Sequence, residues 1–220
     1  MKKTLSAALV GLLLGTSSLA HANLSNLSIN VGAINVNPDS EVSKLDQDPT
    51  LGLNVDDDTQ LGITIDYALN DNWVLELIAA TPFSHDVDGR AGLKGASIGE
   101  VKHLPPTLLG QYHFGQAGDK FRPFVGAGIN YTIFFDEEAG QDLKTVLGTN
   151  DVDVELDDSL GLAAQVGFNY ALDKNWGLHG MVSYMDIDSD ASVYANGVKA
   201  LTVDIKIDPV VAMFGVRYSF

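Results

Sequence analysis

The sequence contains no cysteine and few basic residues. Without cysteine, disulfide bonds, thiol catalysis and cysteine-ligated zinc are all excluded. Lys and Arg number 13 against 29 Asp and Glu, and the formal net charge is −16. A balance this acidic argues against binding to nucleic acid and to phosphate-rich anionic substrates.

Long apolar runs are also missing beyond the first residues. The basic start Met1-Lys2-Lys3 precedes the apolar run Leu5–Leu14, and Ala20-His21-Ala22 follows as a cleavage site of small residues. This order is typical of a secretory signal peptide, and the apolar run is too short and too interrupted for a membrane-spanning helix. We therefore expect residues 1–22 to be cleaved and residues 23–220 to form one domain.

The sequence does contain segments in which two kinds of residue alternate, and the pattern is clearest at the C-terminus. Phe214, Val216, Tyr218 and Phe220 share one face, and the intervening face is mixed, small or charged. A period of two predicts a strand. An apolar face that ends in aromatics indicates a strand facing lipid, because aromatic girdles border the apolar band of outer-membrane barrels.

Eight such alternating segments can be counted along the chain. They are Asn26–Val36, Thr59–Leu69, Trp73–Pro82, Pro106–Phe114, Arg122–Ile133, Leu160–Tyr170, Trp176–Ile187 and the terminal Val210–Phe220. Short turns alternate with long polar stretches, and the long ones are Asn37–Asp58, Phe83–Leu104, Phe134–Ser159 and Asp188–Lys206. The last of these can partly extend the final two strands, since Leu201, Val203, Ile205 and Ile207 alternate too. Short periplasmic turns and long extracellular loops are the pattern of barrels in the bacterial outer membrane. We predict an all-β fold, an eight-stranded antiparallel transmembrane β-barrel, with both termini on the periplasmic side.

The inward residues divide by height along the barrel. A polar floor is expected near the periplasmic end, formed by Asp66, Glu76, His113, Arg122 and Arg217. At least one contact between a carboxylate and a guanidinium is expected there, because charges in a narrow lumen are costly unless paired. Farther out, the inward residues are apolar: Ile78, Leu109, Phe124, Met181, Met185 and Met213.

The apolar layer leaves two hypotheses open. Eight strands leave an interior that side chains can fill or that can hold one small ligand. A water-filled pore would be polar throughout. The barrel is therefore either a passive conduit for small hydrophobic molecules, or a structural or surface-interaction barrel whose lumen is closed.

Proline is unusual in a closed ladder because it lacks an N–H donor. Pro82, Pro105 and Pro106 fall near the outer halves of two adjacent predicted strands. These prolines either end the strands or weaken the wall, so that an apolar solute can leave sideways into lipid.

Other motifs favour no chemistry. The acidic clusters near Asp56, Asp151 and Asp186 are interpreted as solvated loops, since no glycine-containing calcium loop is present. His85 and His103, at the two ends of one long stretch, are interpreted as ordinary loop histidines rather than a metal pair. Ser84-His85 is the only adjacent Ser/His pair, which is weak support for a nucleophile and its base. We expect no enzymatic activity, no cofactor and no metal.

Several blocks in this order closely resemble the outer membrane protein W (OmpW) family over essentially all of residues 23–220. They are Ala79–Phe83, His103–Thr107, Phe121–Thr132, Tyr184–Asp188 and Arg217–Phe220. The resemblance implies an eight-stranded barrel with a narrow, mostly apolar channel, associated with passage of small hydrophobic molecules across the outer membrane. The family's constriction maps to Ile78, which preserves an aliphatic side chain, and to Ser183, which departs from the bulky aromatic expected there.

The expected partners follow from this interpretation. They are outer-membrane lipid, small hydrophobic solutes and the barrel assembly machinery, with no nucleic acid. By analogy with other such barrels, the assembly machinery is expected to read the ending that carries Tyr218 and Phe220.

Overall fold

The structure is a computed structural model that describes residues 24–38, 51–91 and 94–220. The predicted signal peptide therefore lies outside the described residues. Within the described part, no helix combines the length and the apolar character that crossing a membrane requires.

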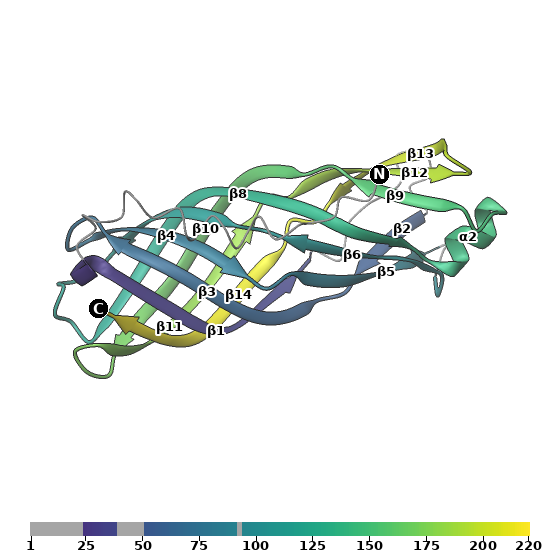
Figure 1. Ribbon diagram of the computed structural model, residues 1–220. Helices are drawn as coiled ribbons and strands as arrows, with labels where there is room; N and C mark the ends of the chain where they lie inside the picture. The colour runs from purple at the N-terminus through teal and green to yellow at the C-terminus, as the bar shows by residue number, and fades with distance from the viewer. Residues whose placement is uncertain (1–23, 39–50, 92–93) are drawn as a thin grey trace.

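Eight antiparallel strands close into a barrel (Figure 1). They are β1 (Leu27–Asn37), β3 (Asp58–Ala68), β4 (Trp73–Ala80), β7 (Thr107–His113), β8 (Phe121–Ala139), β10 (Ser159–Ala171), β11 (Trp176–Met185) and β14 (Val210–Ser219). The ring closes because β14 pairs with both β1 and β11, and β8 pairs with both β7 and β10. The predicted eight-stranded antiparallel barrel is confirmed.

The first described residues and the C-terminus meet at the end of the barrel that carries the short turns. The short 3₁₀ helix η2 (Leu24–Asn26) leads into β1, and the Phe220 amide donates to the Leu27 carbonyl at 3.1 Å. Local hydrogen bonds shape the turns: the Asn70 side chain accepts from the amides of Asn72 and Trp73, and Asp173 accepts from those of Asn175 and Trp176. Asn and Asp favour turns for this reason.

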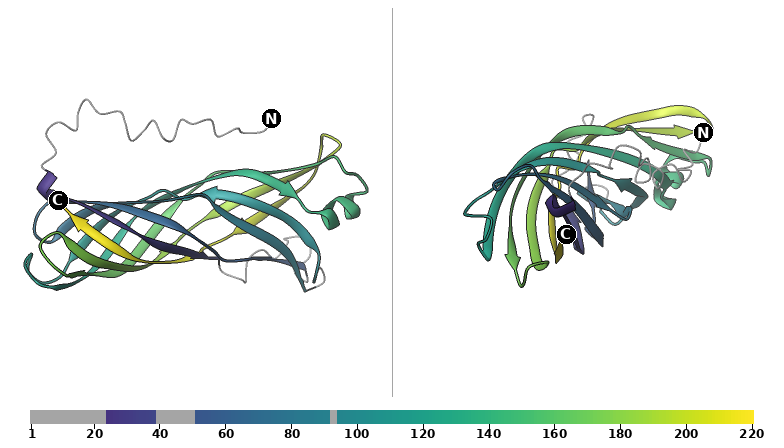
Figure 2. Two further views of the ribbon diagram at one scale, coloured as in Figure 1. Left: turned by 60° about the horizontal axis from the view of Figure 1, so that its bottom comes forward. Right: turned by 60° about the vertical axis from the view of Figure 1, so that its left-hand side comes forward.

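The long connections at the other end form regular strands over most of their length, and not only in the last stretch, where alternation allowed an extension. These stretches contain the strands β2 (Leu51–Val55), β5 (Phe83–Ala91), β6 (Ser97–Leu104), β9 (Val152–Leu156), β12 (Asp188–Ala195) and β13 (Val198–Lys206), and the helix α2 (Gln141–Leu147). β2, β5 and β6 continue the sheet along the outer half of β8, whereas β9, β12 and β13 form a separate sheet. The wall therefore extends well beyond the closed ring, as Figure 2 shows.

The outside of the closed ring is apolar. Leu75, Leu77, Leu108, Val125 and Ile129 each expose more than a third of their surface, and so do many similar side chains. Aromatics border this belt at the short-turn end, where Trp73 packs on Tyr112 and Trp176 packs on Tyr218. A contiguous apolar surface of this kind marks contact with an apolar environment. In a closed barrel with aromatic borders that environment is lipid.

Candidate functional site: the lumen and its outer cleft

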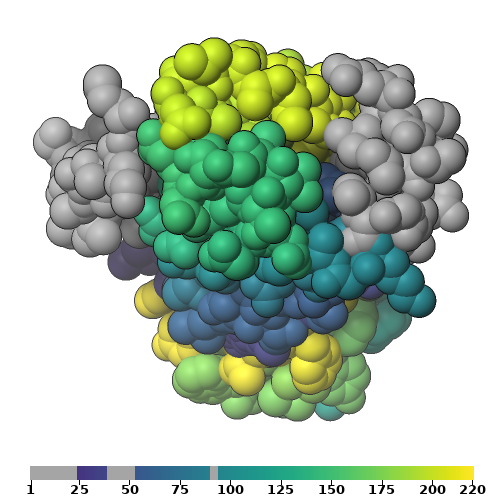
Figure 3. Space-filling model, turned by 90° about the vertical axis from the view of Figure 1, so that its right-hand side faces the viewer, coloured from purple at the N-terminus to yellow at the C-terminus, as the bar shows by residue number. Residues whose placement is uncertain are grey.

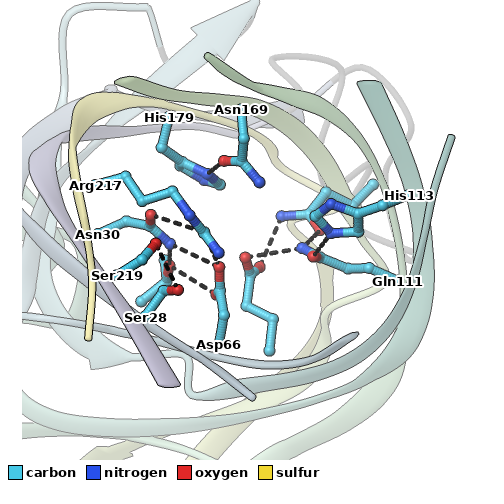
Figure 4. Close-up of polar contacts among 12 residues, drawn as sticks. Ser28, Asn30, Asp66, Gln111, His113, Asn169, His179, Arg217 and Ser219 are labelled. Atoms are coloured by element: carbon cyan, nitrogen blue, oxygen red, sulfur yellow. Dashed lines mark hydrogen bonds and ion pairs between the residues drawn. The ribbon is translucent and has the colours of Figure 1, made fainter. Parts of the chain in front are cut away.

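The polar floor of the lumen is organised around an ion pair (Figure 4). Arg217 of β14 contacts the Asp66 carboxylate of β3, and it also donates to Asn30 Oδ1 at 3.1 Å. Asn30 of β1 in turn donates to Asp66 at 3.1 Å. Asp66 is almost completely buried, so its charge is stabilised by these partners rather than by water. The predicted contact between a carboxylate and a guanidinium is confirmed.

Glu76 forms the second half of the floor, and its partners are amides. Its carboxylate accepts from Gln111 at 2.8 Å and from Gln165 at 2.9 Å. Gln111 also donates to Gln165 at 2.9 Å and accepts from the His113 ring at 2.8 Å. Glu76, Gln111 and Gln165 come from β4, β7 and β10, so the network crosses the lumen. Gln165 was not among the predicted floor residues.

Arg122 is the one predicted floor residue that lies apart from the floor carboxylates. Its guanidinium donates to the backbone carbonyl of Asp71 in a short turn. Arg122 lines an inner cavity of about 840 Å³ at the periplasmic end, together with Lys174 and Asn175 of another turn. The inward position of Arg122 is correct, but its place at the end of the strand brings it to the rim.

An aromatic layer joins the floor to the apolar lumen above it. Phe124 stacks between the rings of His113 and His179, with ring centroids 4.9 and 5.7 Å away. The Phe124 ring also lies against Gly167 of β10, where any Cβ would collide with it. Glycine at that position gives the ring its space. His179 is held by Asn169, to which its Nδ1 donates at 2.9 Å.

The predicted channel-lining residues come together as one packed cluster. Leu109, Met185, Ile78, Phe124, Met213 and Met181 are all at most 4% exposed. They belong to a single apolar cluster that also includes Ile34 and Val211. Ser183 is buried beside them, and its hydroxyl donates to the Ala164 carbonyl at 3.0 Å. In this conformation these side chains fill the lumen.

The wall between β4 and β7 contains a gap in its strand pairing. The β4–β7 register ends at Ile78↔Thr107, and the β5–β6 register begins at Phe83↔His103. The three prolines lie in the intervening segments, 79–82 on one side and 104–106 on the other. Pro105 and Pro106 have no N–H to contribute to the strand pairing beside this gap.

A buried polar cluster that was not predicted from the sequence lies behind the gap. Asn130 donates to Thr107 at 2.8 Å, and Thr132 donates to Asn130 at 2.7 Å. The Pro105 carbonyl accepts from Thr107 at 3.0 Å. These side chains are fully buried. Asn130 and Thr132 are separated from the inward-facing Phe124 by an even number of residues along β8, and this spacing could have predicted that they also face inward.

An apolar cleft of about 310 Å³ opens at the outer end, between the two outer sheets. One side comes from β2, β5, β6 and β8, and the other from β9, β12 and β13. The apolar lining includes Leu53, Val55, Val87, Ile98, Val101, Phe134, Leu143 and Val146 of α2, Val154, Leu156, Val193, Leu201, Val203, Ile205 and Ile207. Figure 3 looks onto this end, where α2 and the β12–β13 hairpin form much of the described surface. At its base, Phe134 and Ile207 join the cluster that fills the lumen.

The interpretation of His85 and His103 as ordinary loop histidines is wrong. They lie beyond the lipid-facing belt on paired strands, with their Nε2 atoms 2.8 Å apart. The rings stack on each other, and the His103 ring also stacks on Phe83 and Phe134. Burial lowers the pKa of His103 to about 3, and burial also lowers the pKa of His85. Both rings are therefore neutral at pH 7.

One of the acidic clusters is partly assembled in space. Carboxylate oxygens of Asp186, Asp188 and Asp208 lie within 4.8 Å of one another. Asp188 also pairs with Lys206 at 3.8 Å. Asp208 was not part of the predicted cluster, because β12 and β13 separate it from Asp186 in the sequence.

A closed eight-stranded barrel with a lipid-facing belt, aromatic borders and a lumen divided into polar and apolar layers defines an outer-membrane β-barrel protein. The chain belongs to the OmpW family, which it matches over residues 24–220. It is 41% identical to outer membrane protein W of Escherichia coli over 221 residues, which is 100% of each chain. It is 47% identical to outer membrane protein W of Vibrio cholerae over 172 residues, 76% of each chain. The crystal structure of OprG from Pseudomonas aeruginosa matches with a TM-score of 0.78 and 41% identity, covering 88% of this chain and 95% of that one.

Proposed function

We propose that this outer-membrane barrel is a passive conduit for small hydrophobic molecules, and that it releases them sideways into the membrane. One observation carries the proposal: a single apolar cluster runs from the outer cleft to the polar floor. Phe134 and Ile207 at the base of the cleft belong to the same cluster as Met185, Leu109 and Phe124 in the lumen. An apolar solute can therefore move inward along this surface until it meets the polar floor.

The polar floor gives the reason for a lateral exit. To continue toward the periplasm, an apolar solute would have to separate Asp66 and Glu76 from their partners, and a buried charge without a partner is very costly. The gap between β4 and β7 lies just above this level, beyond Ile78 and Thr107. Lipid is the nearest apolar medium on the other side of that wall.

A solute can pass only if the side chains that fill the lumen move aside. Three of the side chains that fill it are Met181, Met185 and Met213. Methionine is unbranched and flexible and adapts to irregular ligands. Burial of apolar surface gains roughly 25 cal/mol per Å². For a small solute that is enough for weak, transient occupancy and too little for tight capture.

One comparison supports an apolar solute. A more distant relative from Pseudomonas aeruginosa, 26% identical over 164 residues, is named dibenzothiophene metabolism operon protein PahQ. Dibenzothiophene is a neutral aromatic molecule of the kind that an apolar cleft accepts. The proposed role needs no catalytic residue, cofactor or metal. Its partners are outer-membrane lipid and small hydrophobic solutes.

The substitution Ile78→Asp tests the conduit. Ile78 is 2% exposed in the apolar cluster beside the wall gap, so a carboxylate there should repel an apolar solute. Uptake of a labelled hydrophobic compound should fall to the level of cells that lack the protein. The control Ile78→Leu keeps volume and polarity and should retain uptake. Equal uptake with Ile78→Asp, wild type and no protein would reject the conduit and favour the surface-interaction barrel.

A second substitution protects this test against a folding defect, because a buried carboxylate can prevent assembly. Met185→Gln keeps an unbranched side chain of similar length and makes it polar. Met185 lies within reach of the Thr107 and Asn130 side chains, which can hydrogen-bond the new amide. We expect normal heat-modifiable gel mobility with reduced uptake.

A further inference from the structure

The buried polar cluster behind the wall gap is set in the apolar part of the lumen. Thr107, Asn130 and Thr132 are each 0% exposed. Met185, a member of the apolar cluster that fills the lumen, lies against two of them. Its Sδ is 3.7 Å from Asn130 Nδ2 and 3.7 Å from Thr107 Oγ1. The polar groups therefore face the space that the lumen-filling side chains occupy.

The orientation of the Asn130 amide follows from its partners. The Pro105 carbonyl can only accept a hydrogen bond, and it lies 3.3 Å from Asn130 Nδ2. The amide nitrogen is thus on that side, and Oδ1 is on the other side, where it accepts from Thr132 at 2.7 Å. Both N–H groups of Asn130 consequently point toward Pro105, Thr107 and Met185.

One of these two N–H groups has only weak acceptors. The first donates to the Thr107 hydroxyl at 2.8 Å, and that hydroxyl donates to the Pro105 carbonyl at 3.0 Å. The second shares the same carbonyl at the longer distance of 3.3 Å, or it contacts the Met185 sulfur, which is a weak acceptor. A buried donor in this situation gains from a stronger acceptor.

The cluster lies where the proposed path leaves the lumen. Thr107 is the last residue of β7 that pairs with β4, and its register partner is Ile78. The polar cluster therefore adjoins the gap in the wall. A solute that takes the place of the Met185 side chain would lie against Asn130 directly before this gap.

From these observations, and on the basis of the proposed conduit, we infer that Asn130 is the donor of a polar subsite in the lumen. The subsite accepts the single neutral oxygen of an otherwise apolar solute, such as the carbonyl oxygen of a ketone. This oxygen replaces the Met185 sulfur and accepts from the second N–H of Asn130. The conduit thus favours such solutes over hydrocarbons of the same shape, because a few polar groups give an apolar site its specificity.

Two probes of nearly the same shape test this inference. They are 2-acetylnaphthalene and 2-isopropenylnaphthalene, in which a methylene group replaces the carbonyl oxygen. Their uptake is compared in cells that carry wild-type protein, no protein, Asn130→Leu or a control. Leucine is close to asparagine in size and branching and has no side-chain N–H. The control is Asn35→Leu, because Asn35 lies between the buried Ile34 and Val36 on β1 and its side chain faces away from the lumen.

The ratio of ketone uptake to alkene uptake is the quantity that the subsite determines. Asn130→Leu should lower this ratio about threefold or more, which is the net effect of one ordinary hydrogen bond. Alkene uptake should change less than about twofold, since the substitution conserves volume. Asn35→Leu should leave the ratio unchanged.

A second measurement needs no substitution in the cluster. The side-chain amide resonances of Asn130 are followed by nuclear magnetic resonance in isotope-labelled wild-type protein, purified and refolded in detergent. The ketone should move an amide proton downfield, because its oxygen is a stronger acceptor than sulfur. The alkene at the same concentration should not produce this shift.

The outcomes separate this inference from the conduit itself. If alkene uptake depends on the protein but the ratio is the same in wild type and Asn130→Leu, the subsite is wrong and the conduit stands. If uptake of both probes is equal with and without the protein, the conduit fails and the inference fails with it. A ratio that falls as far with Asn35→Leu would overturn the assignment to the lumen. Should Asn130→Leu assemble poorly, the resonances of the wild type decide: a downfield shift with the ketone alone supports the subsite, and equal responses to both probes overturn it.

Discussion

Asp66 and Arg217 form an ion pair across an intervening strand. Asp66 lies on β3 and Arg217 on β14, and β1 pairs with both strands. Asn30 of β1 lies opposite Arg217 in the strand register. Its side chain donates to Asp66 and accepts from Arg217. Three consecutive strands of the ring are thereby tied together on the inside of the barrel.

Arg217→Met should therefore destabilise the barrel strongly. Asp66 is 1% exposed, and among the described residues Arg217 is the only guanidinium that contacts its carboxylate. The substitution removes that contact. Breaking one side of a buried ion pair costs about 3–5 kcal/mol. We expect the denaturant midpoint, followed by heat-modifiable gel mobility, to fall accordingly. The double substitution Asp66→Asn with Arg217→Met removes both charges and should recover much of the loss. No recovery would show that the pair itself is not what stabilises this layer.

Periodicity predicted the eight strands because each strand must present one apolar face to lipid. Leu75 and Leu77 face outward, and the intervening Glu76 faces inward. The same parity brought Asp66 and Arg217 to the lumen, so their contact could be predicted. Parity does not give height or register. For this reason it did not show that Glu76 would pair with Gln165, or that Arg122 would reach Asp71.

Apart from the alternation that allowed an extension near β13, the strands of the outer extension were not predicted, because their alternation is hidden by their composition. Val152 and Leu156 are buried, Val154 and Leu156 line the cleft, and the acidic Asp153 and Glu155 between them are exposed. Counted together, such residues indicate a polar loop, whereas their period of two indicates a strand. Similarly, the stacking of His85 on His103 depends on the β5–β6 register. Spacing along the chain does not fix that register.

The histidine pair should make the outer extension sensitive to pH. The pKa of His103 falls from 6.5 to about 3 on burial, so the packed form takes up no proton between these values, whereas an opened form does. The free energy of opening should therefore decrease as pH falls from 6.5 toward 3, by up to about 1.4 kcal/mol per pH unit for each such histidine. The carboxylates of Asp56, Asp57 and Asp58 oppose this effect at His85.

Hydrogen exchange of the β5–β6 hairpin at pH 7.5 and 5.0 measures this effect, after correction for intrinsic exchange rates. His103→Phe is the matched comparison, because its ring can keep the stacking on Phe83 and Phe134 without a titrating group at that position. Wild type should lose more protection at pH 5.0 than this variant does. The same loss in both proteins would exclude His103 as the cause.

Pro106→Ala should stiffen the wall on the β7 side of the gap. The Pro106 carbonyl accepts from the Tyr131 amide of β8 at 3.0 Å, so an N–H restored at position 106 also points to β8 and can extend the β7–β8 pairing beyond Thr107↔Asn130. If solutes leave sideways at this point, uptake of a labelled apolar compound should decrease severalfold, with thermal stability unchanged or higher. Pro209→Ala, at the start of β14 and far from the gap in the strand order, is the control. Unchanged uptake with Pro106→Ala and normal barrel levels would argue against an exit that depends on this proline.

Deleting Phe220 should lower the amount of protein in the outer membrane. Phe220 is 48% exposed, packs edge-on against Tyr218 with ring centroids 5.0 Å apart, and donates a backbone hydrogen bond to Leu27. The finished barrel depends little on it, because β14 is already paired along its length with β1 and β11. We propose that its main role is recognition by the barrel assembly machinery. The assembled fraction of the deletion variant should be severalfold lower, whereas protein refolded in detergent should melt within a few degrees of wild type. Phe220→Trp keeps an aromatic terminus and should restore the level. Normal outer-membrane levels of the deletion variant would contradict this role, and an equally large loss of melting temperature in detergent would make Phe220 a structural residue instead.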